Sequence, residues 1–459
     1  MSETDGLQAA TPSARPPVAD SNIYRWYVLI LLTIVYTFNF VDRQIMGILA
    51  PAIQKDLGLA DWQLGILMGF AFAVLYTTLG IPVARLADRF NRVTIISISL
   101  AMWSGFTALC GMAQNFSQLA LARVGVGIGE AGGSPPAHSL ISDYFPKEKR
   151  AGALAIYALG IPIGIALAYL GGGWLTQTFS WRVAFMVIGF PGIAVALLFK
   201  LTVKERPRGR FDGAAVDVFK ADENVGLSFK DVIAKEVKIV WRAAKHLLSI
   251  PSYRGIAIAG TAVSFTSYAV GGWIIVFYSR IHTDFPILQV YFWMGIIAGT
   301  CYVAGTFLGG YLVDKFSVKD KRMYGFIPAI ALLLNIPCFL ITIWTNNPVI
   351  SIAFQAPVNL ALGFYLGPMF ALAQTLAPVS VRALSTAILF FILNLIALGF
   401  GPTTAGILSS LMTDAFGPEL ALRLALTIIS GGSLFGMWMF YRTGKRVPVD
   451  WENAAKAVE

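Results

Sequence analysis

The stretch 84–92 reads Ala-Arg-Leu-Ala-Asp-Arg-Phe-Asn-Arg, and the stretch 310–316 reads Gly-Tyr-Leu-Val-Asp-Lys-Phe. Both contain the motif Leu-x-Asp-basic-Phe. A second similarity lies further along each half, where a proline is followed four residues later by Arg-Ala, at Pro146 and at Pro378. Motifs that recur in the same order indicate an internal duplication. The sequence therefore predicts two related halves in the same orientation.

The composition excludes a soluble globular protein. The 459 residues include 35 Lys and Arg and 25 Asp and Glu, so 13% of the chain is charged and 56% is hydrophobic. A soluble domain has about 25% charged residues, so most of this surface must face lipid. Cys110, Cys301 and Cys338 lie in apolar stretches without His or Cys at metal-ligand spacing. We expect no disulfide framework, metal site or thiol nucleophile.

The apolar runs predict the membrane spans. A helix needs about 20 apolar residues to cross the hydrocarbon core, and about twelve such runs are present. The predicted fold is an all-α membrane protein with 12 transmembrane helices in two six-helix, pseudo-symmetric halves. The expected spans are 25–51, 61–86, 92–113, 117–143, 149–176, 180–204, 254–281, 286–313, 323–346, 348–377, 381–411 and 417–442.

Basic residues predict the orientation. The side with both chain termini holds most of the Lys and Arg, whereas the other side has only Lys55, Arg182, Arg280 and Arg423. By the positive-inside rule, both termini are expected in the cytoplasm. The net charge of +10 is then explained without nucleic-acid binding. The compact loops and the lack of a targeting segment suit an integral protein of a bacterial inner membrane.

The long connection between the halves sets the domain boundaries. We expect a disordered cytoplasmic tail at 1–22, six-helix halves at 23–204 and 253–443, a cytoplasmic linker at 205–252 and a cytoplasmic tail at 444–459. In the linker, Ser228 and Asp231 resemble a capping box, and apolar residues follow at helical spacing with Lys and Arg between them. This amphipathic helix could bind anionic lipid headgroups or brace the halves as a solvated linker.

Four charged residues are predicted inside the membrane, where they are costly and therefore candidates for function. They are Asp42 and Arg43 in the first span and Arg123 and Glu130 in the fourth. Asp42 and Arg123 lie at similar depth, so we expect them to pair. Glu130 follows Arg123 by two helical turns, near the membrane centre. Burial favours its neutral form and a nearby Arg its charged form, so a moving Arg could make it exchange a proton. A static ion network that holds the two helices together is the alternative.

The loop 84–92 resembles the cytoplasmic loop of the major facilitator superfamily, whose fold would cover residues 25–442. The family favours Gly, Gly and a basic residue where this chain has Ala84, Asn91 and Val93. The resemblance implies that the loop is part of a cytoplasmic gate. Its residues would be Asp88, Arg89, Arg92 and, in the second half, Asp314 and Lys315.

The fourth span is similar to one branch of this superfamily. It carries the pattern Arg-x-x-x-Gly-x-Gly at 123–129, and Glu130 and Ala131 with Gly-Gly-Ser-Pro-Pro at 132–136 resemble Spinster transporters. That resemblance implies a lipid cargo of the lysophospholipid or sphingoid phosphate type. It also implies that Asp42, Arg43, Arg123 and Glu130 form the coupling and binding group.

Other features of the spans are interpreted more simply. The glycines at 127, 129 and 132 fit a dinucleotide motif but follow no strand, so we expect them to allow close helix packing, as at 160, 164, 305 and 309. His138 could relay protons, although a structural role is favoured. The second half offers only polar candidates for a cavity. Those chosen are Tyr268, Gln355, Asn359 and Asn394.

These features predict a secondary active transporter that works by alternating access. It is expected to be proton-coupled, to move a single-chain amphiphilic lipid, to contact membrane lipids and to act as a monomer. The sequence contains no ATP-binding loop and no convincing nucleophile pair, so neither an enzyme nor a cofactor is expected beyond protons as the coupling ion. The alternatives are an exporter of drugs or organic anions and a non-transporting membrane sensor.

Overall fold

The structure is a computed structural model that describes residues 21–211, 229–378 and 381–456. The described chain is almost entirely helical and contains no strand. Ten of its helical segments are long and apolar enough to cross a membrane. One of these, Leu384–Ala454, contains a non-helical Gly417 with φ 77° and therefore comprises two helices. The predicted span 117–143 is divided between two shorter helices.

The first half contains six predicted spans. The second, fourth and fifth are each interrupted by short non-helical or π-helical steps. In chain order the elements are α1 (Asn22–Leu57), α2 (Asp61–Met68), α3 (Phe70–Arg89), α4 (Arg92–Cys110), α5 (Phe116–Glu130), α6 (Ser134–Tyr144), α7 (Lys147–Ala158), α8 (Gly160–Leu167), η1 (Ala168–Gly172), α9 (Gly173–Thr178) and α10 (Trp181–Thr202).

The linker helix is followed by the second half, whose helices are interrupted in a similar way to those of the first half. The tenth span is interrupted near residue 364, and the eleventh contains a π-helical turn. The elements are α11 (Phe229–Ser249), α12 (Pro251–Ile281), α13 (Ile287–Ser317), α14 (Met323–Trp344), α15 (Pro348–Gly363), α16 (Leu366–Leu376), α17 (Arg382–Leu393), η5 (Asn394–Leu398) and α18 (Gly399–Lys456). The predicted all-α fold is thus confirmed.

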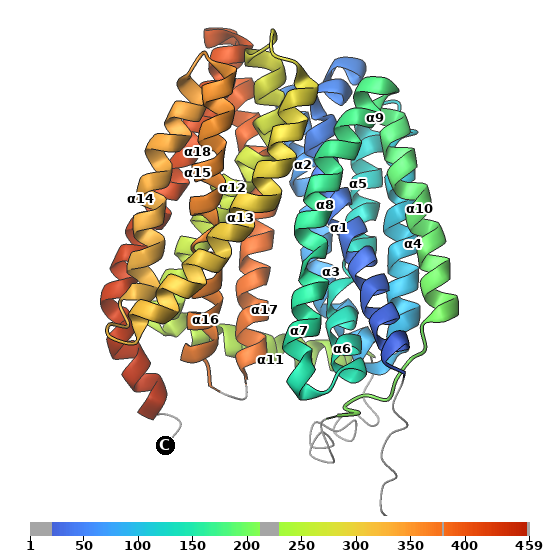
Figure 1. The fold of residues 1–459 in the computed structure, drawn as a ribbon, viewed down its shortest axis with the longest axis vertical. Helices are drawn as coiled ribbons and strands as arrows, with labels where there is room; N and C mark the ends of the chain where they lie inside the picture. Colours follow the sequence, from blue (N-terminus) through green and yellow to red (C-terminus); the bar gives the residue numbers. More distant parts are fainter. Residues whose placement is uncertain (1–20, 212–228, 379–380, 457–459) are drawn as a thin grey trace, which may run out of the picture.

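The two halves stand side by side, and α11 lies across one end of the molecule (Figure 1). We call this end, which also holds the start of α1 and the end of α18, the terminal face, and the other end the opposite face. Contacts between the halves join α1 to α12, α2 to α18 and α8 to α13. A Cβ at Gly47 would meet the Gly272 carbonyl oxygen at 3.0 Å. Toward the opposite face, the Trp62 amide of α2 donates a hydrogen bond of 2.9 Å to Ser410 Oγ of α18 and so joins the two halves.

The glycine motifs have the packing role predicted from the sequence. A Cβ at Gly305 would collide with the backbone of Leu360, and one at Gly309 with Phe364, so α13 packs closely on the tenth span. Gly129 lies against the backbone of Trp103 in the same way. Small residues allow helix backbones to approach in a membrane. Neighbouring protein atoms occupy the space beside these glycines, so a nucleotide has no room there.

The C-terminal half does not end at the predicted boundary 443, because α18 continues to Lys456. The extension is bound to the second half. Val447 is fully buried, Asp450 Oδ2 accepts a hydrogen bond of 2.8 Å from the Ser252 amide at the start of α12, and the Trp451 ring lies 5.4 Å from that of Tyr324. The acid offsets the unpaired amides of that helix terminus.

The predicted linker helix is present as α11 (Phe229–Ser249), while Ser228 of the proposed capping box lies outside the described residues. Leu247 is buried, whereas Trp241 is 71% exposed. Arg242 and Lys245 are also exposed. The helix contacts α12 and α17 of the second half with its apolar side. This arrangement fits both of the roles that the sequence left open.

Candidate functional site

Four charged side chains meet between α1 and α5 in the first half. Arg43 Nε donates a hydrogen bond of 2.9 Å to Glu130 Oε2. Arg123 Nη1 lies 3.7 Å from Asp42 Oδ1, and Thr107 of α4 donates a hydrogen bond to Asp42 Oδ2. We call Asp42, Arg43, Arg123 and Glu130 the ion group. Asp42, Arg123 and Glu130 are each at most 2% exposed, so their charges are held away from solvent.

The expected pairing of Asp42 with Arg123 is present, but Glu130 pairs with Arg43 rather than with Arg123. The depths of these residues along the predicted spans did not indicate this pair. The Cβ bonds of a helix tilt toward its N-terminus, and α1 begins at the terminal face. The long Arg43 side chain can therefore reach toward that face, to a carboxylate two turns beyond Arg123 on α5.

Aromatic rings surround the Arg43 guanidinium. Its Cζ lies 4.4 Å from the ring centroid of Tyr76, 5.3 Å from that of Phe40 and 5.6 Å from that of Phe72. The Phe72 ring also lies 5.2 Å from the Arg123 guanidinium. A cation over a desolvated aromatic face gains about 2 kcal/mol. These rings hold Arg43 in place without neutralising its charge.

Several polar atoms of the ion group have no hydrogen-bond partner among the described residues. They are Asp42 Oδ1, Glu130 Oε1, and Nε and Nη1 of Arg123. Buried polar atoms are nearly always hydrogen-bonded in proteins, to protein or to water. The ion group thus has unused donors and acceptors that a proton, water or a polar group of a ligand can engage.

One of the four predicted cavity residues of the second half reaches the ion group. Tyr268 of α12 lies near Arg43 and Tyr76. Gln355 and Asn359 instead bond to each other along α15, from Asn359 Nδ2 to the Gln355 carbonyl at 2.9 Å. Asn394 begins the π-helical turn η5.

Tyrosines extend the site into the second half, and the sequence reading missed them. Tyr302 interacts with Tyr268, and the Tyr365 and Ser264 hydroxyls are hydrogen-bonded at 2.7 Å. Tyr365 also interacts with Tyr268 and Tyr302. The signal that could have indicated them is the occurrence of hydroxyl-bearing aromatics deep inside apolar runs. Tyr268 thus lies near the ion group, and Tyr302 and Tyr365 lie next to Tyr268; we call these three tyrosines the aromatic wall.

His138 lies on α6, on the terminal side of Glu130, and packs its ring 5.3 Å from that of Tyr157. Tyr157 stacks on Tyr36 at 4.3 Å, and Tyr36 interacts electrostatically with Arg43 and Glu130. The aromatic contact is the structural role favoured by the sequence. The same contacts connect His138 to the ion group through Tyr157 and Tyr36.

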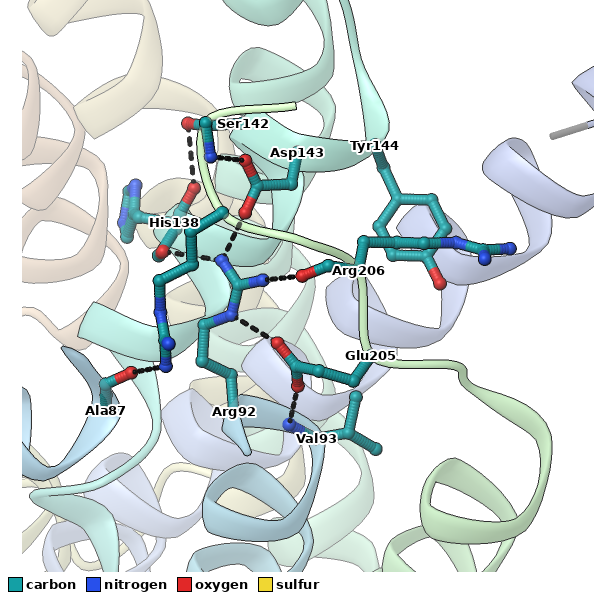
Figure 2. A network of polar contacts seen from close by, with 12 residues as sticks. Ala87, Arg92, Val93, His138, Ser142, Asp143, Tyr144, Glu205 and Arg206 are labelled. Carbon is teal, nitrogen blue, oxygen red and sulfur yellow. Dashed lines mark hydrogen bonds and ion pairs between the residues drawn. The ribbon is translucent and has the colours of Figure 1, made fainter. Parts of the chain in front are cut away.

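The terminal face of the first half is held by Arg92 (Figure 2). This fully buried guanidinium donates to Glu205 Oε1 at 2.6 Å, to the Arg206 carbonyl at 2.6 Å, to Ser139 Oγ at 2.8 Å and to Asp143. These partners lie on α6 and in the segment after α10, so the network joins the first half to the start of the linker and does not reach the second half. The sequence analysis missed Asp143 and Glu205 as partners of Arg92. The available signal was that each acid lies at the terminal-face end of a predicted span, Asp143 at the end of 117–143 and Glu205 directly after 180–204.

The other predicted gate residues make no comparable network. The side chains of Asp88 and Arg89 lie outside the described residues. Asp314 and Lys315 at the end of α13 are exposed, and Lys315 Nζ lies 5.9 Å from the Tyr311 ring and 5.8 Å from the Phe316 ring. In this conformation, the described members of the predicted gate do not pair across the terminal face.

An open cavity of about 470 Å³ lies at the opposite face, between the ends of α1 and α12. It is lined by both halves, including Lys55, Tyr291 and His282. None of its lining residues belongs to the ion group. It is a recess at the junction of the halves, whereas the ion group is buried between α1 and α5.

Residues 32–402, which are more than half of the chain, match the Major Facilitator Superfamily. The chain belongs to the major facilitator superfamily. An MFS-type efflux pump of Mycolicibacterium smegmatis is similar to this major facilitator, with 31% identity over 423 residues that cover 92% of the chain and 93% of the relative. The probable galactarate/D-glucarate transporter GudP of Bacillus subtilis is 29% identical over 365 residues, which cover 76% and 79%.

A solved structure of a bacterial homologue of the human lysosomal transporter Spinster is also similar. It is in an inward-facing, unoccupied conformation, and it matches with a TM-score of 0.81 at 29% identity, covering 94% of this chain and 99% of that one. The resemblance to Spinster expected from the fourth span is thus confirmed. The fold and the relatives are those of transporters rather than enzymes. The chain is a secondary transporter of the major facilitator superfamily.

Proposed function

We propose that this transporter moves a single-chain amphiphilic lipid, of the lysophospholipid or sphingoid phosphate type, together with protons. The observation that carries the proposal is the state of Arg43. Its guanidinium is held by three aromatic rings and by a hydrogen bond to Glu130, whose Oε1 is buried without a partner among the described residues. A phosphate or phosphodiester can take the place of that carboxylate on Arg43, because guanidinium binds both groups in the same geometry.

Such an exchange couples the lipid to a proton. When a lipid phosphate binds Arg43, Glu130 loses its cationic partner while it remains buried. A buried unpaired carboxylate is strongly disfavoured, so Glu130 binds a proton as the lipid binds. Its free Oε1 can carry that proton without breaking a protein hydrogen bond. Lipid head and proton therefore occupy the site together, and they separate again when Glu130 returns to Arg43.

The second half is suited to the apolar part of the cargo. The aromatic wall of this half approaches the ion group through Tyr268, which lies near Arg43, and its other members, Tyr302 and Tyr365, lie near Tyr268. A sugar would require more hydrogen-bonding side chains around it. One charged wall and one aromatic wall match a molecule with an anionic head and one acyl chain. The resemblance of the fourth span to Spinster supports the same cargo.

We further propose that the terminal face lies in the cytoplasm of a bacterium, with the protein as a monomer in the inner membrane. The excess of Lys and Arg on this face supports that orientation. The structure would then be open to the inside. A solved structure that is similar over 94% of this chain is described as inward-facing.

The second candidate function is export of drugs or other organic compounds. It is favoured by the similarity to an MFS-type efflux pump over 92% of this chain. A third possibility, a sugar-acid carrier, follows from the similarity to the probable galactarate/D-glucarate transporter. A sugar acid or another organic anion would use Arg43 for its anionic group, and neither it nor a drug would need the aromatic wall.

Ligand-dependent thermal stabilisation of the purified protein tests these functions. The ligands are lysophosphatidylglycerol, sphingosine 1-phosphate, galactarate and a cationic drug, each at acidic and neutral pH. A ligand that binds the folded state raises its melting temperature by mass action. Stabilisation by the two lipids, stronger at acidic pH, supports the proposal and is followed by flux into proteoliposomes. Stabilisation by galactarate or the drug alone refutes the lipid cargo.

A further inference from the structure

A further ion pair lies at the opposite face, away from the ion group, and it joins the two halves. Arg280 donates from Nη2 to Asp61 Oδ1 at 2.8 Å and from Nη1 to Asp61 Oδ2 at 2.9 Å. Gln54 Nε2 donates to Oδ1 at 2.6 Å, and Ser409 Oγ donates to Oδ2 at 2.5 Å. We call these four residues the Asp61 cluster. Each oxygen of the carboxylate thus has two donors.

The cluster draws its members equally from both halves. Gln54 is on α1 and Asp61 begins α2, whereas Arg280 is near the end of α12 and Ser409 is on α18. The other ion pairs within 4.0 Å among the described residues join groups of the same half or, for Arg92 with Glu205, the first half and the start of the linker. Asp61 with Arg280 is therefore the ion pair that crosses between the halves in the described chain.

Around the Asp61 cluster, the backbone of α2 is in direct contact with α18. The amide of Trp62 donates to Ser410 Oγ at 2.9 Å, and Gly406 packs against the Asp61 carbonyl without room for a Cβ. Asp61 is only 7% exposed. Such a pair is strong only while water is excluded, since both charges must be solvated again once the halves separate.

We propose that Asp61 and Arg280 are positioning residues of the transport cycle, which hold the opposite face closed and set the balance between the two access states. The first step toward opening this face must separate α2 from α12 and α18, and this breaks the bidentate pair. The N-terminus of α2 stabilises the Asp61 carboxylate whether the opposite face is closed or open. The free-energy difference between these two states therefore comes from the donors of the second half, Arg280 and Ser409. The inference rests on the transport function of the family and is independent of the lipid and of protons.

The same face provides a matched control. Arg182 and Asp56 form an ion pair within the first half, with side chains that are 34% and 46% exposed. Replacing Asp56 by Asn removes a carboxylate of the same kind, a few residues from Asp61, without touching a contact between the halves. A general effect of lost charge would appear in both variants, whereas release of the closed face would appear only at the Asp61 cluster.

The test measures the reaction of a cysteine with a maleimide. Cys110, Cys301 and Cys338 are replaced by Ser, and Thr403→Cys provides the reporter. Thr403 is only 7% exposed and donates a hydrogen bond of 3.2 Å to the Gly65 carbonyl of α2, so α2 covers it in the closed state. In purified full-length protein, Asp61→Asn and Arg280→Gln should each label about tenfold faster than the parent, because a two-state equilibrium responds exponentially to the lost pair. Arg280→Lys should fall between, since an ammonium lacks the planar fork of guanidinium. Asp56→Asn should label at the parent rate.

The outcomes are distinct from those of the lipid proposal, because the assay contains no substrate. Equal labelling of the parent and both cluster variants would overturn the inference, provided that the variants elute as folded monodisperse protein. Equal acceleration by Asp56→Asn would also overturn it. If Asp61→Asn does not fold, Ser409→Ala removes one donor to the same carboxylate from the second half, and it should accelerate labelling by a smaller factor.

Discussion

Replacing Glu130 by Gln should tighten the binding of an anionic lipid. In the structure, the carboxylate competes with the lipid phosphate for Arg43 through one charge-assisted hydrogen bond of 2.9 Å. Such a bond contributes about 1.5–3 kcal/mol, and the neutral one that Gln can still accept contributes about 0.5–1.5 kcal/mol. The competitor is thus weakened by about 1–1.5 kcal/mol. This difference corresponds to roughly five- to tenfold higher affinity.

The pH dependence gives the sign of the effect. A proton on wild-type Glu130 removes its charge, so wild-type affinity should rise as the pH falls and approach that of Glu130→Gln. The variant has no carboxyl to titrate at this position, and its affinity should change little with pH. Lysophosphatidylglycerol is a suitable probe because its phosphodiester stays ionised at acidic and neutral pH.

Titration of the purified protein with lysophosphatidylglycerol, followed by microscale thermophoresis at both pH values, measures this prediction. Asp56→Asn serves as the control, since its carboxylate is exposed and belongs to a different ion pair. Weaker binding by Glu130→Gln would show that Glu130 contacts the lipid rather than competing with it. A pH dependence unchanged in the variant would remove Glu130 from proton coupling altogether.

Three further predictions concern the remaining charges and the packing. Arg92→Ala should lower stability by about 3–5 kcal/mol, because it leaves buried carboxylates without a cation, whereas Arg92→Lys should lose less; thermal unfolding in detergent measures both. Gly305→Val should cost about 1–3 kcal/mol through overpacking, but Gly310→Ala, which meets no atom within 4 Å, should be neutral or stabilising in the same assay. Replacing Asp42 by Asn and Arg123 by Gln should show a coupling of about 0.5–3 kcal/mol in a double-mutant cycle of stability, and additive losses would contradict a direct pair.

The sequence was most informative where a property depends on a run of neighbouring residues. The spans follow from the length of apolar runs, because a helix must be long enough to cross the hydrocarbon core. The recurring Leu-x-Asp-basic-Phe motif indicated the duplication for a similar reason. The packing glycines at 305 and 309 were also predictable, since small residues four positions apart share one helix face.

The boundary at 443 shows where such local patterns fail. The polar residues after it predict a tail, but they continue α18 because Val447 is buried and Asp450 bonds to the start of α12. A polar helix is stabilised here by contacts with α12 and α14, which lie far away in the sequence. Neither composition nor periodicity contains that information.

The sequence by itself determined that this protein is a duplicated membrane carrier, and that Asp42, Arg43, Arg123 and Glu130 lie within its spans. Charge inside an apolar run is a local property, so it could be found without the fold. Only the tertiary structure decided that Glu130 pairs with Arg43, because pairing depends on helix rotation and on the reach of a long side chain. It also decided that Asp61 meets Arg280, 219 residues away. Ion pairs between halves arise from how two separate bundles meet, which no stretch of sequence records.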